Sequence, residues 1–96
     1  MTENRDALID KFNARMKQVQ ARVDLLKAKA EEADADTRMK LRKEIEEIQA
    51  RRNSLESRLG ELKNSGSEAW RDLQAGAEAG WRALSSAVER AASRFG

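Results

Sequence analysis

The side chains that could do chemistry in this chain are carboxylates and cations, since the 96 residues include no histidine, cysteine or tyrosine. This composition removes the usual general base near neutral pH, the thiolate nucleophile and the commonest nitrogen ligand of metals. The one compact acidic group is Glu31, Glu32, Asp34 and Asp36, which could attract a hard cation. Its order is not that of an EF-hand loop, and it lacks the glycine of such a loop. We interpret it as a solvated turn.

Two further kinds of site are not expected. Gly76 and Gly80 lie inside a helical repeat with no preceding strand, so they do not resemble a phosphate-binding loop. The basic residues between positions 38 and 63 alternate with glutamates, and the net charge is only +2. A nucleic-acid interface would concentrate basic residues on one face. We therefore predict a protein that is not an enzyme, has no cofactor, metal or small-molecule substrate, and does not bind nucleic acid.

The composition predicts long helices. The chain is rich in alanine, glutamate, lysine, arginine and leucine and contains no proline, which favours one all-α domain. Charged residues make up 38% and aromatic residues 4%, so few large apolar side chains are available for a core. A thin core is usually supplemented by association, and we expect a homo-oligomer. No signal peptide or membrane-spanning segment is expected, which favours a cytoplasmic location.

Two segments between residues 5 and 63 carry apolar residues at alternating steps of three and four, the pattern of a left-handed coiled coil. The seams are Ile9, Phe12, Met16, Val19, Val23 and Leu26 in the first segment, and Leu41, Ile45, Ile48, Arg52, Leu55, Leu59 and Leu62 in the second. Between them, at residues 31–37, the apolar phase slips by one residue and two aspartates offer capping oxygens. We predict a tight turn there and an antiparallel coiled-coil hairpin, whose helices span residues 5 to 63 of a unit comprising residues 1–63. One continuous helix from Arg5 to Lys63 is the alternative.

The hairpin would pair residues whose numbers add up to 71, such as Ala30 with Leu41. In this register Arg15 and Arg22 would each lie beside an arginine of the second segment. We interpret them as extending into water, since exposed ion pairs contribute less than about 1 kcal/mol. The alternative is an acidic partner, such as Glu68, Asp72 or Glu78 of the third segment or of another copy. Arg52 in the seam would either fix the register or extend its guanidinium to solvent.

The residues from 64 to 96 form a linker and an amphipathic C-terminal helix. The run Asn64-Ser65-Gly66-Ser67 indicates the end of one helix and a new cap, so we expect the third helix to run from Ser67 to Phe95. An eleven-residue unit beginning at Trp70 is followed at once by another beginning at Trp81. Eleven residues make three turns of about 3.67 residues, so the apolar side chains form one nearly straight stripe. That stripe comprises Trp70, Leu73, Ala77, Trp81, Leu84, Val88, Ala92 and Phe95.

A second stripe on this helix consists of small residues. Its members are Gly76, Gly80, Ala83, Ala87 and Ala91. Small residues at this spacing allow another helix to approach closely, and a glycine inside a helix costs about 1 kcal/mol relative to alanine. We therefore expect the third helix to be contacted on two faces, one large and one small.

The C-terminal segment carries the only specific resemblance to known proteins. The run Ser67-Glu68-Ala69-Trp70, followed by Leu73, Gly76, Glu78, Trp81, Leu84, Ala87 and the terminal Ala91-Ala92-Ser93-Arg94-Phe95, resembles the end of small bacterial coiled-coil proteins of unassigned function. The resemblance implies a helical cytosolic protein and supplies no catalytic residues.

Two functions are consistent with these patterns. The first is a structural or adaptor protein that acts through homo-oligomeric helix packing or through a partner helix. The second is a peripheral membrane protein whose tryptophan-bearing helix lies on a lipid surface, as amphipathic helices with large side chains on one face do. Arg71, Arg82, Arg90 and Arg94 are balanced by acidic residues, so attraction to anionic headgroups is weak. We favour the first function.

Overall fold

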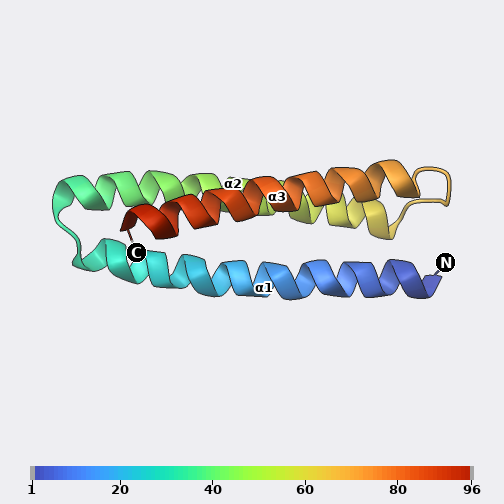
Figure 1. Cartoon of the computed structure of the whole chain (residues 1–96), viewed down its shortest axis with the longest axis horizontal. Helices are drawn as coiled ribbons and strands as arrows, with labels where there is room; N and C mark the ends of the chain where they lie inside the picture. Colours follow the sequence, from blue (N-terminus) through green and yellow to red (C-terminus); the bar gives the residue numbers. More distant parts are fainter. Residues whose placement is uncertain (1, 96) are drawn as a thin grey trace.

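The structure is a computed structural model that describes residues 2–95, with side chains from Arg5 onward. Within that range it consists of three helices, α1 (Thr2–Glu32), α2 (Ala35–Lys63) and α3 (Trp70–Phe95). The helices lie side by side in a rod of 51 × 18 × 18 Å, in which α2 runs antiparallel to both α1 and α3 (Figure 1). The predicted all-α class, with a helical hairpin and a third helix, is confirmed.

The turn between α1 and α2 consists of Ala33 and Asp34 and is closed by two sets of hydrogen bonds. The Asp34 carboxylate accepts a bond of 2.9 Å from the amide of Thr37, which caps the start of α2. The Arg38 guanidinium donates to the carbonyls of Ala30 (3.2 Å) and Ala33 (3.1 Å) at the end of α1. The chain therefore turns where the phase slip predicted it, although no glycine or proline is present.

Two helix boundaries differ from those we predicted. Helix α1 already begins at Thr2 rather than Arg5. Helix α3 begins at Trp70, so the prediction that Ser67 caps it is wrong. Residues 67–69 form a turn, and the first helical hydrogen bond runs from the amide of Leu73 to the carbonyl of Ala69 (3.0 Å). The connection must first cross the interaxial distance of about 8–10 Å between α2 and α3, which uses these residues before a helix can start.

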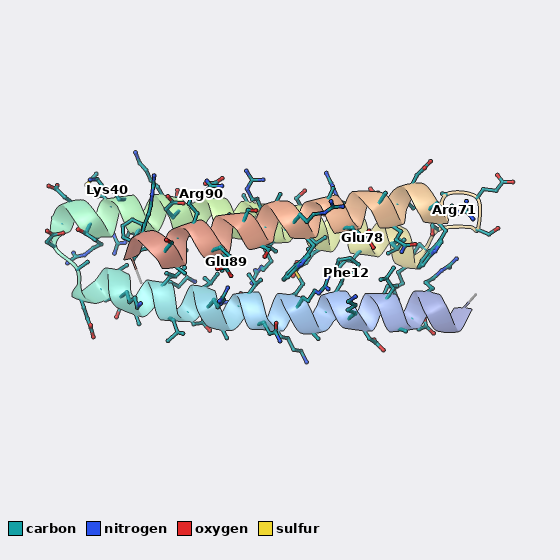
Figure 2. The ribbon with its side chains drawn as sticks, viewed as in Figure 1. Phe12, Lys40, Arg71, Glu78, Glu89 and Arg90 are labelled. Carbon is teal, nitrogen blue, oxygen red and sulfur yellow. The ribbon has the colours of Figure 1, made fainter. Side chains whose placement is uncertain are left out.

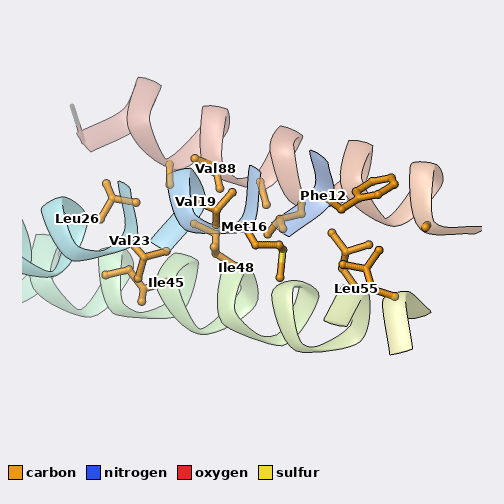
Figure 3. Packing of buried hydrophobic residues seen from close by; sticks show 14 of the residues in the cluster. Phe12, Met16, Val19, Val23, Leu26, Ile45, Ile48, Leu55 and Val88 are labelled. Carbon is orange, nitrogen blue, oxygen red and sulfur yellow. The ribbon is translucent and has the colours of Figure 1, made fainter. Parts of the chain in front are cut away.

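A continuous apolar core runs along the axis of the rod and receives side chains from all three helices (Figure 3). The fully buried large residues are Phe12, Val23, Leu41, Ile48, Leu55, Leu62, Leu84 and Val88. Every predicted seam residue belongs to the buried core except Ile9, which is half-buried against it, and Arg52. The periodicity of α1 and α2 therefore identifies the faces that the hairpin buries.

Candidate helix-packing site

Helix α3 contacts α2 through its small side chains. Ala87 and Ala91 are fully buried. A methyl group added at Gly80 would lie 3.4 Å from Cδ1 of Leu55, so α2 leaves room for little more than one carbon there. At the neighbouring turn the Arg58 guanidinium donates a bond of 2.6 Å to the carbonyl of Gly76. Of the three pairs of helices, α2 and α3 have the backbones that approach each other most closely.

The contact between α3 and α1 has a different composition. Both tryptophans of α3 are half-buried, and each is covered by an arginine of α1. The guanidinium carbon of Arg5 lies 5.1 Å from the ring centroid of Trp70, and that of Arg15 lies 5.1 Å from the ring of Trp81. Such stacking places a cation over the negative face of the indole while its outer edge meets water. Of the three pairs of helices, α1 and α3 have the backbones that approach each other least closely.

An ion pair continues the same row of contacts. Arg22 of α1 donates a bond of 2.7 Å to Glu89 of α3, and both side chains are more than half exposed. Figure 2 shows Glu89 directed from α3 toward α1. We expected Arg22 and Arg15 to extend into water, and that interpretation is wrong because both contact α3. The alternative was an acidic partner, for which we named Glu68, Asp72 and Glu78; the acidic residue that contacts Arg22 is instead Glu89.

The rim between α1 and α3 is hollowed beside these contacts. One hollow is lined by Val19, Arg22, Trp81, Ser85, Val88 and Glu89, and a second lies by Leu8, Lys11, Trp70 and Gln74. We call this surface, from Trp70 and Arg5 to Glu89 and Arg22, the α1–α3 rim. It exposes aromatic and apolar edges between charged side chains, which is the composition of many protein-binding surfaces.

Polar side chains also set the register on the α2 side. Arg52 is half-buried and donates through Nη1 to the side-chain carbonyl of Gln20 on α1, which joins the two helices of the hairpin. Its Nε atom is buried and has no hydrogen-bond partner among the described residues. Glu44 of α2 accepts a bond of 2.9 Å from Arg94 at the end of α3. Arg52 was expected either to fix the register of the hairpin or to extend its guanidinium to solvent, and the contact with Gln20 favours the first role.

The predicted interaction residues of α3 fall into two groups. Ala77, Leu84 and Val88 are buried inside the bundle, whereas the half-buried members are Trp70, Leu73, Gly76, Gly80, Trp81 and Phe95. The chain's own helices therefore bury the centre of the large apolar stripe, whereas its aromatic side chains stay half-buried at the edge of the bundle. The sequence pattern did not predict the arginine–tryptophan contacts, because helical periodicity separates only apolar from polar residues and arginine counts as polar.

The electrostatics of the described residues offer one clear pKa shift and no chemical centre. Hydrogen bonds from Thr37, first from its side chain and then from its amide, lower the pKa of the Asp34 carboxyl. Among residues 2–95 no group of three or more carboxylates is placed to hold a metal ion. Nor does any helix in this part of the chain have the length and apolar character needed to cross a bilayer.

Comparisons with known proteins give no relative for this chain. No protein-family model matches it, and neither a curated protein nor a solved structure shows a significant match.

Proposed function

We propose that the protein is a non-enzymatic structural or adaptor protein that acts through helix packing between copies of itself, in the cytoplasm. The observation that carries this proposal is the α1–α3 rim, where two tryptophans remain half-buried between the two helices whose backbones approach least closely. Apolar surface removed from water contributes about 25 cal/mol per Å², so a helix that covers both indoles gains a substantial favourable term.

The location of the rim suits such packing. It runs along the length of α1 and α3, and the molecule is a narrow rod. A helix from another copy can therefore follow it over several turns, as helices do when they add to a bundle. The rim also carries both signs of charge, from Arg22 and Glu89, so an approaching helix with mixed charges meets no uniform repulsion.

Sedimentation velocity over a concentration series tests this proposal. The wild-type chain is expected to associate reversibly, and Trp81→Ala to weaken the association about tenfold or more, since aromatic residues at the centre of an interface carry much of its energy. Met39→Ala is the matched control, because Met39 is 63% exposed on α2 and lies outside the rim. A wild-type chain that stays monomeric at millimolar concentration would overturn the proposal.

A second candidate is lipid binding by α3. It is favoured by the half-buried Trp70, Trp81 and Phe95, which mark one side of an amphipathic helix. Lipid binding would require α3 to give up the burial of Leu84 and Val88 inside the bundle, which is why we place it second. Tryptophan emission measured with and without small vesicles separates the two. Emission that is already blue-shifted in buffer and unchanged by vesicles excludes this candidate, whereas a shift that requires lipid supports it.

A further inference from the structure

We propose that α1 exchanges between two copies of the chain. In the resulting dimer, α1 and α2 of each copy form one continuous helix, and α1 lies on the α2–α3 pair of the other copy. This inference rests on the proposed function, association between copies of the chain, but its mode is exchange of α1 in place of packing of a further helix on the rim. The α1–α2 turn lies at the end of the rod opposite the α2–α3 connection, so α1 can leave while α2 and α3 stay together (Figure 1).

The spacing of apolar residues across the turn supports a continuous helix. The one-residue slip that interrupts the seven-residue repeat leaves Ala30 and Leu41 eleven positions apart, which is three helical turns, so both still lie on the same face if residues 31–40 become helical. Ala33 and Thr37 then continue the stripe between them, and both are already half-buried. No glycine or proline interrupts this stretch, so nothing in it opposes helix formation strongly.

The exchanged dimer would keep the contacts of the hairpin. Residues of α1 and α2 whose numbers add up to about 71 meet in the hairpin, as the bond between Gln20 and Arg52 illustrates. An antiparallel pair of continuous helices brings the same residues together between chains. In this register residues 31–33 lie along residues 38–40 of the partner, which places Glu31 and Glu32 beside Arg38 and Lys40, whereas Asp34 and Asp36 meet residues 35–37 at the crossing.

The structure also indicates why α1 is the helix that leaves. Its backbone approaches that of α3 least closely of the three pairs, and three of its interactions with α3, made by Arg5, Arg15 and Arg22, involve guanidinium groups at the rim. Contacts of this kind are individually weak and are made again by the α1 of the second copy. The occupant that best fits the vacated groove is therefore an identical α1.

The turn itself sets the balance between the two forms. The cap by Asp34 and the bonds from Arg38 to the end of α1 exist only in the hairpin, because a continuous helix uses those backbone groups internally. The dimer gains the burial of Ala33 and Thr37 at the crossing. Short connections between helices are known to favour such exchange when they are weakened.

The substitution Ala35→Pro separates the two forms. Ala35 is the first residue of α2, where proline is well tolerated, and Asp34 has φ −66° and ψ 168°, the extended conformation that a residue before proline prefers. In the continuous helix the same proline would lie in the interior and break it. We expect Ala35→Pro to keep the helical monomer and to raise the dimer dissociation constant at least about a hundredfold.

The substitution Asp34→Ala should act in the opposite direction. It removes a cap that only the hairpin uses and places the best helix former in the continuous helix. We expect the dimer to tighten about tenfold. Asp10→Ala, which removes an exposed carboxylate in the middle of α1, is the matched control and should leave the dissociation constant unchanged.

A distance measurement shows the exchange directly. The chain has no cysteine, so Ala21→Cys and Ala50→Cys, both at exposed positions, introduce two unique spin-labelling sites. In the hairpin these positions face each other on adjacent helices, about 8–10 Å apart between axes. In a continuous helix their separation of 29 residues corresponds to about 44 Å. Labelled chains are refolded with an excess of unlabelled chain, so that only distances within one chain contribute.

The outcomes distinguish this inference from the proposed function. A population near 44 Å that grows with total protein concentration and disappears with Ala35→Pro supports exchange. Association that is equally strong in Ala35→Pro, with only the short distance, overturns exchange and leaves packing between intact bundles. A wild-type chain that is monomeric at every concentration overturns both.

Discussion

The two interfaces of α3 differ in their chemistry. Against α2 it presents Gly80, Ala87 and Ala91, and the helices approach so closely that an added methyl group would touch Leu55. Against α1 it presents Trp70 and Trp81, each half-buried under an arginine. The first interface packs small groups closely, whereas the second leaves aromatic edges and charges at the surface. One amphipathic helix thus packs closely on one side and through longer side chains on the other.

This difference shows how an eleven-residue repeat can serve two purposes. The small stripe fixes α3 on α2, and the large stripe reaches from the core to the rim. A uniformly apolar helix would have buried both faces equally. A helix with one small and one large stripe leaves the α1–α3 rim partly exposed. Both proposals use this surface, at which the bundle can open or associate.

The largest expected effect comes from removing the side chain on which α3 packs. Leu55→Ala should lower the free energy of unfolding by about 2–5 kcal/mol, because Leu55 is fully buried beneath Gly80 and its loss leaves a cavity. Urea denaturation followed by circular dichroism measures the change. Leu25→Ala, at a site that is 65% exposed, is the control and should change stability by less than about 0.5 kcal/mol. Equal losses in both variants would contradict the assigned core.

The closeness of α2 and α3 can be tested from the other side of the same contact. Gly80→Leu should cost about 1–3 kcal/mol, since the added atoms meet Leu55 and Arg58. Gly80→Ala is the matched control: its methyl group would lie 3.4 Å from Leu55, an ordinary contact, and alanine stabilises a helix by up to about 1 kcal/mol over glycine. If leucine is tolerated as well as alanine, the two helices do not approach each other as described.

A smaller effect is expected at the α1–α3 rim. Arg15→Ala should cost about 0.5–1 kcal/mol, the usual contribution of an exposed cation–π contact. In a Trp70→Phe background the emission then reports Trp81 alone and should shift to longer wavelength as the indole loses its cover. Lys17→Ala, an exposed position on the same helix, should leave the emission unchanged. An unshifted spectrum in Arg15→Ala would show that the arginine does not cover the ring.

The smallest effect concerns the turn that attaches α1. The pKa of the Asp34 carboxyl is lowered in the folded chain, so its contribution to stability is present above its ordinary value of about 3.9 and is lost as the pH falls through the folded value. The wild-type chain should therefore lose slightly more stability than Asp34→Ala between pH 5 and pH 2. Parallel curves of unfolding free energy against pH would mean that the Thr37 bonds do not stabilise the ionised carboxylate.

Much of the fold follows from sequence patterns, for identifiable reasons. Steps of three and four residues define the buried faces of α1 and α2, and the phase slip with two aspartates locates the turn at Ala33 and Asp34. We predicted the start of α3 three residues too early. A serine after a glycine indicates a helix cap, but it does not indicate how far the connection must extend before the helix can begin. Local sequence patterns therefore do not report the distance that a connection must span between two helices.

The rim was less predictable than the core. The contact of Arg22 with Glu89 depends on the axial position of α3 relative to α1, which the periodicity within each helix leaves undetermined. The stacking of Arg15 on Trp81 depends in addition on the long stem of arginine, which packs along apolar surface while its charge stays near water. A search for arginines at seven-residue spacing beside the seam, as at positions 15 and 22, would have indicated this edge.

Native-state hydrogen exchange tests the central claim, that α1 is the loosely held helix and α2 and α3 form the stable pair. The measurement follows amide exchange by mass spectrometry at increasing, sub-denaturing urea concentrations. Amides of α1 between residues 12 and 26 are predicted to open together at a lower free energy than those of α2 and α3. Opening of α3 before α1, or of all three helices at one common free energy, would contradict the claim and remove the basis for exchange of α1.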